Sequence, residues 1–315
     1  MIVLALGLSG CSSASTDTAT GRATDTVSGQ ATDTVTGHAG DTVTGSAAPG
    51  ASTIGSAASS SAAPGSPAAG SSATGPSTAL LNWWHPQAGL TWQWQLSGTV
   101  DTSVNVQVYD IDGDNDASVV AALHAAGRKV ICYVDAGSYE SFRADADEFP
   151  ASVLGKSNGW PGERWLDIRQ IAILKPIMAA RFAACAKKGF DGIEADNVDG
   201  YENDTGFDLT ADDQLAYNRM LAALAHADGL AIGLKNDPDQ VEQLLPSFDF
   251  SVDEQCFEYQ ECDELVPFIK ADKPVFEVEY NLQTSQFCTQ AAALGFSSMR
   301  KNLALDEPRW PCAVE

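Results

Sequence analysis

Short apolar runs alternate with longer stretches of helical period from Trp92 to the end of the chain. The short runs are rich in Val, Ile, Phe, Tyr and Trp, which is typical of β-strands. We predict eight strands, over residues 91–96, 104–110, 129–135, 190–196, 230–235, 248–254, 274–280 and 296–301.

The longer stretches predict helices over residues 117–126, 171–188, 211–227 and 287–294. A glycine follows each of them, where a left-handed residue commonly ends a helix: Gly127, Gly189, Gly229 and Gly295. Asp116 and Thr210 precede two helices, and we expect both to be N-caps. Strands that alternate with helices imply a parallel sheet, and eight of them favour a (β/α)8 TIM barrel, an α/β fold. Residues 97–103 are too few for a helix, so a doubly wound open sheet stays as the alternative.

Residues 12–80 have a different composition, mostly Ala, Gly, Ser, Thr, Pro and Asp, with no Phe, Trp, Tyr or Cys. Such a stretch lacks the apolar surface to offset its ordering entropy, so we predict a disordered low-complexity linker. A unit of the type Ala-Thr-Asp-Thr-Val-Thr-Gly recurs in it and indicates a flexible stalk. The folded domain is expected at residues 81–315.

Residues 1–11 form a short apolar run that ends at Cys11. The run is too short to span a bilayer and resembles the end of a bacterial lipoprotein signal, with Cys11 lipidated. No Lys or Arg precedes Cys11, and an ordinary secretory signal is the alternative. We expect a secreted or cell-surface protein that meets a membrane only through Cys11.

Six cysteines remain after Cys11, an even number that favours disulfides in an exported protein. Among 15 possible connectivities, Cys256 and Cys262 are close enough in sequence to close a small loop, a Cys288–Cys312 pair would fasten the C-terminus, and Cys132 with Cys185 is the pair that remains. The folded part has three histidines and no pair of Cys-x-x-Cys motifs, so we predict no metal site and no cofactor.

The formal net charge is −24, of which −21 belongs to the part beyond residue 80. A field of this sign repels nucleic acid and attracts cations. We therefore exclude nucleic-acid binding. We also expect the protein to be a monomer.

Polar side chains gather where the predicted strands end, which is the rim that carries the active site in barrels. They are Asp110, Asp135, Glu194, Asp196, Lys235, Asn236, Glu254, Glu277 and Glu279. Side chains two apart on a strand share a face. We therefore expect Glu277 and Glu279 to face the barrel mouth and Phe276 and Val278 to face the helices. Paired carboxyl groups in unlike surroundings supply the acid and the nucleophile that glycosidic cleavage requires.

Several segments together resemble glycoside hydrolase family 114, the endo-α-1,4-polygalactosaminidases. They are Trp92-Gln-Trp-Gln-Leu96, Cys132-Tyr-Val-Asp-Ala-Gly-Ser-Tyr-Glu140, Glu163-Arg-Trp-Leu-Asp-Ile168, the segment from Gly189 to Tyr201, Gly233-Leu-Lys-Asn236, Glu254-Gln-Cys-Phe-Glu-Tyr259 and Val275-Phe-Glu-Val-Glu-Tyr280. The resemblance covers nearly all of residues 83–310. It implies a TIM barrel that acts on α-1,4-linked galactosamine of microbial exopolysaccharides. It also implies a retaining mechanism, with Asp196 as nucleophile and Glu254 as general acid/base. Ala195 stands where the family pattern has Pro.

An acidic rim suits a cationic amino-sugar polysaccharide as partner. The expected substrate-binding residues are Asp110, Tyr133, Asp135, Glu194, Asn197, Tyr201, Lys235, Asn236, Glu277, Glu279 and Tyr280. Trp165 is a further candidate for stacking on sugar rings, although each aromatic is equally suited to packing. Two alternatives stay open: a non-catalytic sugar-binding surface lipoprotein, and a hydrolase of the same mechanism that acts on a neutral or N-acetylated glycan.

Overall fold

The computed structural model describes residues 83–313. The expected signal at residues 1–11 and the expected linker at residues 12–80 lie outside these residues. Within residues 83–313, no helix is long and apolar enough to cross a membrane.

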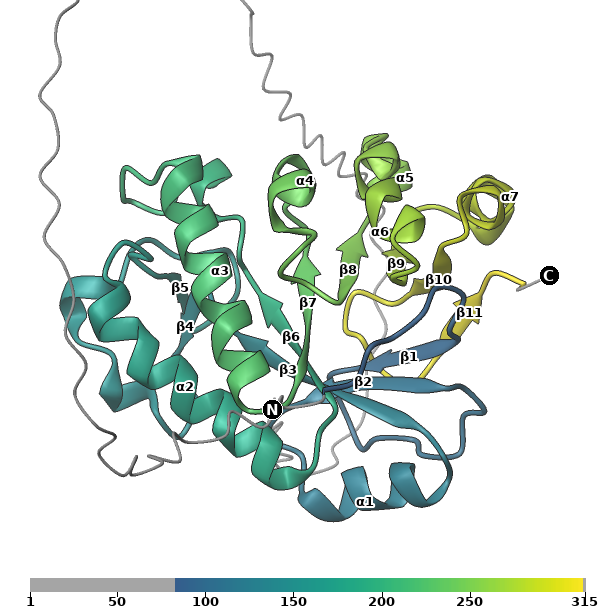
Figure 1. Ribbon diagram of the computed structural model, residues 1–315, viewed down its shortest axis with the longest axis horizontal. Coiled ribbons are helices and arrows are strands. Elements are labelled where there is room, and N and C mark those ends of the chain that lie inside the picture. Colours follow the sequence, from purple (N-terminus) through teal and green to yellow (C-terminus); the bar gives the residue numbers. More distant parts are fainter. Residues whose placement is uncertain (1–82, 314–315) are drawn as a thin grey trace, which may run out of the picture. The chain divides into compact units, whose positions relative to one another are not determined.

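Eight parallel strands form the centre of the domain in the order β1-β2-β3-β6-β7-β8-β9-β10 (Figure 1). Their bounds are β1 Trp92–Gln95, β2 Val108–Asp112, β3 Lys129–Asp135, β6 Gly192–Asp196, β7 Ala231–Lys235, β8 Phe250–Glu254, β9 Val275–Glu279 and β10 Ser297–Lys301. All eight predicted strands are therefore present. The second strand begins at Val108 and not at 104. The residues before it form a turn, whose Asp101 and Val104 carbonyls accept hydrogen bonds from the Tyr109 hydroxyl.

The sheet curls into a nearly closed barrel, as predicted, because its two edges meet. A ninth strand, β11 (Arg309–Pro311), pairs antiparallel with β10 and comes next to β1 (Figure 1). Arg309 donates to the Trp92 carbonyl at 2.8 Å, and the Leu96 amide donates to the Leu305 carbonyl at 2.9 Å. The unbroken strand order and these edge contacts exclude a doubly wound open sheet.

Helices cover the outside of the barrel. They are α1 Ala117–Ala125, α2 Ile171–Lys188, α3 Ala211–Ala227, α4 Val241–Leu244, α5 Cys256–Tyr259, α6 Val266–Lys270 and α7 Thr284–Leu294. The four predicted helices are α1, α2, α3 and α7, and each is followed by a glycine of positive φ. Thr210 caps α3 in a capping box with Asp213, as predicted. Asp116 takes the N-cap position of α1 with an extended backbone, as predicted, but its side chain makes no capping hydrogen bond.

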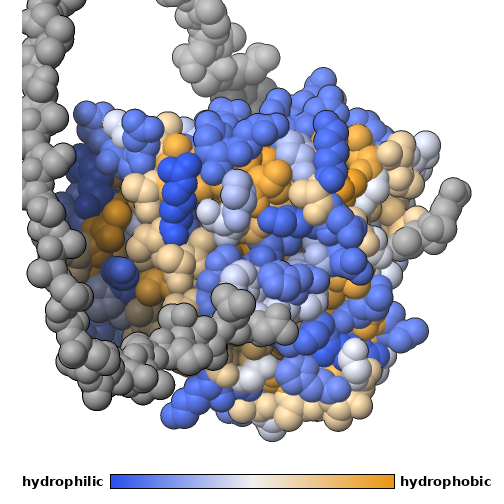
Figure 2. Space-filling view, viewed as in Figure 1, coloured by the Kyte–Doolittle hydropathy of each residue, from blue (hydrophilic) through white to orange (hydrophobic). Residues whose placement is uncertain are grey.

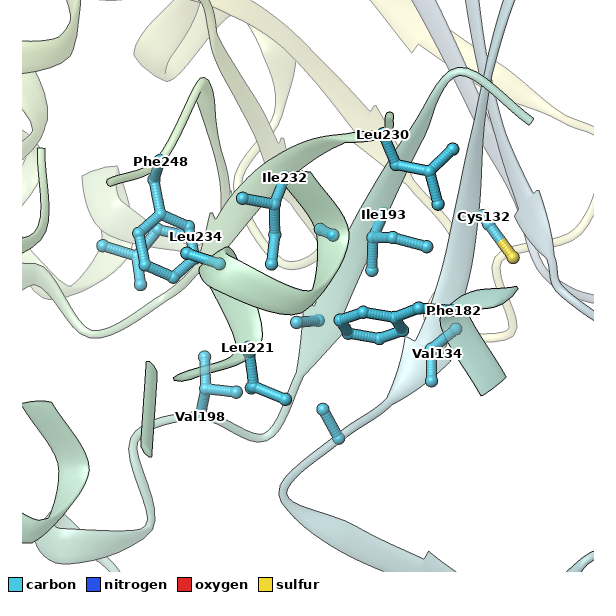
Figure 3. Close-up of a cluster of buried hydrophobic side chains, with 14 of the residues drawn as sticks. Cys132, Val134, Phe182, Ile193, Val198, Leu221, Leu230, Ile232, Leu234 and Phe248 are labelled. Atoms are coloured by element: carbon cyan, nitrogen blue, oxygen red, sulfur yellow. The ribbon is translucent and has the colours of Figure 1, made fainter. Parts of the chain in front are cut away.

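Two apolar cores lie on the two faces of the sheet. Trp92, Trp94, Phe250 and Phe276 fill the barrel interior. The outer core packs α2 and α3 on β3, β6 and β7, and Figure 3 shows side chains such as Phe182 of α2 against this layer. The face drawn in Figure 2 is largely hydrophilic, with small apolar patches, as expected for a strongly acidic domain.

One correction concerns β9, whose side chains face opposite to the sequence-based prediction. Phe276 and Val278 belong to the core inside the barrel, and Glu277 and Glu279 are fully buried on the outer side. A parallel strand is buried on both faces, so polarity alone does not tell which face points inward. Glu279 is buried because its carboxylate accepts hydrogen bonds from the amides of Phe257 and Glu258 at the start of α5.

A two-stranded hairpin and three disulfides complete the fold. The strands β4 (Ser138–Glu140) and β5 (Glu163–Trp165) pair antiparallel, directly after β3. The structure contains the three predicted disulfides, Cys132–Cys185, Cys256–Cys262 and Cys288–Cys312. The first fastens α2 to β3, and the second closes the loop that follows Glu254.

Candidate active site

Two carboxylates and one ammonium group meet at the carboxyl ends of β6, β7 and β8. Lys235 Nζ lies 2.9 Å from Asp196 Oδ1 and 2.7 Å from Glu254 Oε2. Because both oxygens contact the same nitrogen, they are no more than about 5.6 Å apart, the sum of the two distances. Retaining glycosidases hold their two carboxyl groups at about 5–5.5 Å, whereas inverting ones need roughly 6.5–9.5 Å. This bound on the two oxygens is shorter than the separation that an inverting pair needs.

Asp196 is held in its ionised form. Burial favours the neutral carboxyl, but the Lys235 charge and hydrogen bonds from Tyr133, Lys235 and the Asn197 amide outweigh it and lower the pKa of Asp196. The Tyr133 hydroxyl donates to Oδ2 at 2.7 Å, and the Asn197 amide donates to Oδ1 at 2.8 Å. The ionised form of a carboxylate is the one that a nucleophile requires.

Glu254 is fixed from three sides. The Tyr280 hydroxyl donates to Oε1, Lys235 contacts Oε2, and the Asn236 side chain accepts a hydrogen bond from the Glu254 amide at 3.1 Å. Tyr280 follows β9 and Asn236 follows β7, so the two neighbouring strands position this carboxyl group.

The residue after each of these three side chains adopts a left-handed backbone. The values of φ are 59° at Asn197, 50° at Asn236 and 67° at Gln255. Such angles are uncommon outside glycine, and asparagine tolerates them better than most residues. The chain thus turns sharply just beyond the barrel rim while Asp196, Lys235 and Glu254 still point inward. Backbone strain of this kind is concentrated at functional sites.

Gly137 allows the turn after β3 to pack directly on the turn after β6. The Ala136 and Gly137 amides both donate to the Asp196 carbonyl, at 3.1 and 2.9 Å. A Cβ atom at Gly137 would stand 1.5 Å from the Asn197 carbonyl oxygen. Only glycine fits at this position, and the close contact that it allows fixes the backbone at Asp196 and Asn197.

Asp110 and Glu194 form a buried carboxyl pair below the site. Glu194 Oε1 lies 3.8 Å from Lys235 Nζ. Burial raises the pKa of Asp110 to about 7, and burial together with Asp110 raises that of Glu194 well above its usual range. The raised pKa values favour the neutral form of these carboxyl groups, which limits the negative charge beneath Lys235.

The other predicted site residues lie farther from the two carboxylates. Asp135 is the cross-strand neighbour of Asp196, and the Ser138 amide and hydroxyl donate to it. Tyr201 contacts Asp237 at 3.3 Å. Trp165 is buried, so it packs the hairpin and is not available for stacking. Glu277 and Glu279 lie on the outer face of β9, away from the mouth.

Sequence reasoning missed one acidic residue close to Asp196, namely Glu163 on β5. The charge of Asp196 contributes to the raised pKa of Glu163, after the larger effect of burial. The strand is three residues long and follows an irregular segment, so no periodic pattern indicated it.

A cavity of about 250 Å³ lies behind β3, against α2. Its basic walls are already paired: Arg143 with Glu140, Arg181 with Asp145, and Lys188 with the Gly113 carbonyl. We assign it no ligand. Within residues 83–313, no group of three or more His, Cys, Asp or Glu side chains is arranged to hold a metal ion.

An eight-stranded barrel with paired carboxylates at its mouth defines a glycoside hydrolase. The sequence model of glycoside hydrolase family GH114 matches residues 73–315, and the chain belongs to this family. The structure of Aspergillus fumigatus Ega3 in complex with galactosamine is similar, with 42% identity and a TM-score of 0.69 over 73% of this chain and 98% of that one. The glycoside hydrolase domain of PelA from Pseudomonas aeruginosa shares the fold, with 15% identity and a TM-score of 0.55 over 71% of this chain and 99% of that one. A comparison with curated protein sequences finds no significant match.

Proposed function

We propose that this glycoside hydrolase cleaves internal bonds of α-1,4-linked galactosamine polymers. The reaction retains the configuration of the anomeric carbon. The observation that carries the proposal is the Asp196–Lys235–Glu254 cluster, whose spacing suits a retaining pair. The galactosamine in the complex of the similar Ega3 structure supports the choice of sugar.

The reaction takes two steps. Asp196 attacks the anomeric carbon while Glu254 gives its proton to the glycosidic oxygen, so the leaving chain departs as an alcohol. Glu254 then takes a proton from water, and this water displaces Asp196 from the anomeric carbon. Each step inverts the carbon, so the product keeps the α configuration. Tyr133 and Lys235 hold Asp196 in its ionised, attacking form.

The acidic character of the domain favours a cationic amino sugar over a neutral one. The folded part carries a net charge of −21. At a rim of this sign, the ammonium groups of a de-N-acetylated polymer are attracted, and the attraction weakens as salt screens it.

We also propose that the enzyme works outside the cytoplasm. Three disulfides within residues 83–313 support this location, because disulfides persist in oxidising compartments. The apolar run before Cys11 supports a lipid-anchored or secreted form.

Product analysis tests the proposal. The protein is incubated with de-N-acetylated and with fully acetylated galactosamine polymer, and the released oligosaccharides are separated by size. We expect oligomers from the first polymer only, and none from either polymer with Asp196→Asn or Glu254→Gln. Equal cleavage of the acetylated polymer would favour the neutral-glycan alternative. Tight binding with no cleavage of either polymer would favour a sugar-binding protein.

A further inference from the structure

The loop of the β4–β5 hairpin is built around one asparagine. The Asn158 side chain donates to Glu163 Oε2 at 2.8 Å and to Ser138 Oγ at 3.2 Å, and it accepts from the Trp160 amide at 3.1 Å. One amide group thus fixes both the carboxylate of Glu163 and the backbone that carries Trp160.

This hairpin stands at the nucleophile side of the barrel mouth. β4 begins three residues after β3, at the end of the barrel that carries Asp196. Ser138, which receives the Asn158 amide, in turn donates to Asp135, the cross-strand neighbour of Asp196. A continuous chain of hydrogen bonds therefore links the hairpin loop to the strand beside the nucleophile.

Glu163 is a half-buried carboxylate without a cation. Among the described residues, no Lys, Arg or His nitrogen lies within 4.0 Å of it. Arg143, the cation whose charge lowers the pKa of Glu163, is already engaged by Asp112 and Glu140. Burial, with a smaller contribution from Asp196, raises the pKa of Glu163. A cation that arrives with a ligand would remove this penalty.

Trp160 offers an exposed apolar face on the loop that leads to Glu163. Its side chain is 53% exposed although it is the largest side chain of the loop, and the Glu163 amide donates to its carbonyl at 3.2 Å. An exposed tryptophan on the loop that leads to an unpaired carboxylate matches the two faces of an amino sugar, namely the apolar ring face and the ammonium group.

We propose that the β4–β5 hairpin is a subsite for a galactosamine residue next to the scissile bond, in which Glu163 binds the ammonium group and Trp160 contacts the ring. The inference rests on the proposed function for the identity of the sugar. It assigns the discrimination between amine and acetamide to Glu163, a residue outside the catalytic pair.

Calorimetric titration tests the subsite independently of cleavage. Galactosamine oligosaccharides, either de-N-acetylated or fully N-acetylated, are titrated into the full chain carrying Glu254→Gln, with and without Glu163→Gln. We expect Glu163→Gln to weaken binding of the de-N-acetylated oligomer roughly tenfold to 100-fold, the range of a charge-assisted hydrogen bond, and to leave the acetylated oligomer unchanged. Trp160→Ala should weaken the de-N-acetylated oligomer roughly threefold to tenfold. Glu264→Gln and Trp310→Ala, a carboxylate and a tryptophan exposed elsewhere on the surface, are the matched controls.

The outcomes separate this proposal from the proposed function. Equal losses for both oligomers, or no loss with Glu163→Gln and Trp160→Ala, overturn the subsite even if the enzyme cleaves the polymer. Selective loss of the de-N-acetylated oligomer supports the subsite even if the wild-type protein cleaves neither polymer. Trp160→Ala keeps the test decisive if Glu163→Gln does not fold, because the Trp160 side chain is largely outside the core.

Discussion

Lys235 Nζ lies 2.9 Å from Asp196 Oδ1, and the carboxyl groups of Glu194 and Glu254 also lie within 4 Å of it. The ammonium group outweighs the burial of Asp196 and keeps its pKa low. Lys235→Met removes this charge with little change in volume. We expect a loss of roughly 100-fold to 1,000-fold in kcat, the range for the removal of one preorganised donor. The acid limb of the pH–rate profile should move to higher pH, because Asp196 must then lose its proton without help. An unchanged acid limb would contradict this role of Lys235.

Tyr133 acts on the same carboxylate with a smaller effect. Its hydroxyl donates to Asp196 Oδ2 at 2.7 Å, and Tyr133→Phe removes only this hydrogen bond. A hydrogen bond to a charged group contributes about 1.5–3 kcal/mol, so we expect kcat/KM to fall roughly tenfold to 100-fold. Tyr139→Phe on β4 is the control, since Tyr139 packs on Phe149. Steady-state kinetics of the two variants give the comparison, and equal effects would refute a specific role of Tyr133.

Gly137→Ala tests the close packing of the turn after β3 on the turn after β6. The new Cβ would overlap the Asn197 carbonyl oxygen, so the turn after β6 must shift. A shift of about 1 Å at a reacting group can cost roughly 100-fold in rate. We expect such a loss in kcat together with a lower melting temperature, measured by calorimetry. Gly200→Ala is the control, because φ is not positive there and the nearest atoms would lie 3.5 Å from the added Cβ, an ordinary contact distance. Full activity of Gly137→Ala would show that the turns do not constrain the nucleophile.

The buried carboxyl groups predict a stability that falls as the pH rises. Burial raises the pKa of Asp110 to about 7 and that of Asp237 to about 8, and it raises those of Asp253 and Glu277 well above their usual range. A raised folded-state pKa means that the folded protein holds protons that the unfolded chain releases near pH 4. The contribution of these groups to stability is therefore fully present below about pH 4 and is lost as the pH rises through their folded-state pKa values, which are about 7 for Asp110 and about 8 for Asp237.

Thermal unfolding across this window is the check. For a domain of this size, 1 kcal/mol corresponds to about 2–4 °C, so we expect the melting temperature to be roughly 5 °C or more higher at pH 5 than at pH 8. Asp253→Asn with Glu277→Gln should reduce this dependence, because neither replacement titrates. A melting temperature that rises between pH 5 and 8 would be the opposite of what the burial of these groups requires.

Removal of residues 1–79 should leave catalysis intact. Residues 12–80 contain no aromatic side chain to stack on a sugar, and the family match begins only at residue 73. We expect kcat/KM on soluble polymer to change less than about tenfold, that is, by less than about 1.4 kcal/mol of transition-state stabilisation. A larger loss would assign the N-terminal part a role in catalysis.

The sequence was sufficient to predict the barrel because it contains eight β-rich runs and four helical stretches between them, each followed by a glycine. It also located Asp196, Lys235 and Glu254, since they end three predicted strands. It did not predict which side chains of β9 face the barrel interior. Both faces of that strand are buried, so the alternation of side chains along it does not tell which set points inward. Glu277 was assigned to the mouth for this reason.

Residue patterns did not predict the β4–β5 hairpin and did not single out Glu163, although Glu140 and Glu163 both lie in segments that resemble family 114. Strands of three residues are too short for a periodic pattern, and 22 residues separate Glu140 from Glu163. Their pairing depends on tertiary contacts, such as the Asn158 bridge to Ser138, that no local pattern encodes. Contacts between distant segments of this kind appear only in the folded structure.

The anomeric configuration of the first product tests the catalytic pair most directly. A short de-N-acetylated galactosamine oligomer is cleaved in an NMR tube, and the anomeric proton signals are followed before mutarotation equilibrates them. With Asp196 as nucleophile and Glu254 as acid/base within about 5.6 Å, the account predicts that the α-anomer appears first. Initial formation of the β-anomer would show a single displacement by water and would contradict the roles given to Asp196 and Glu254.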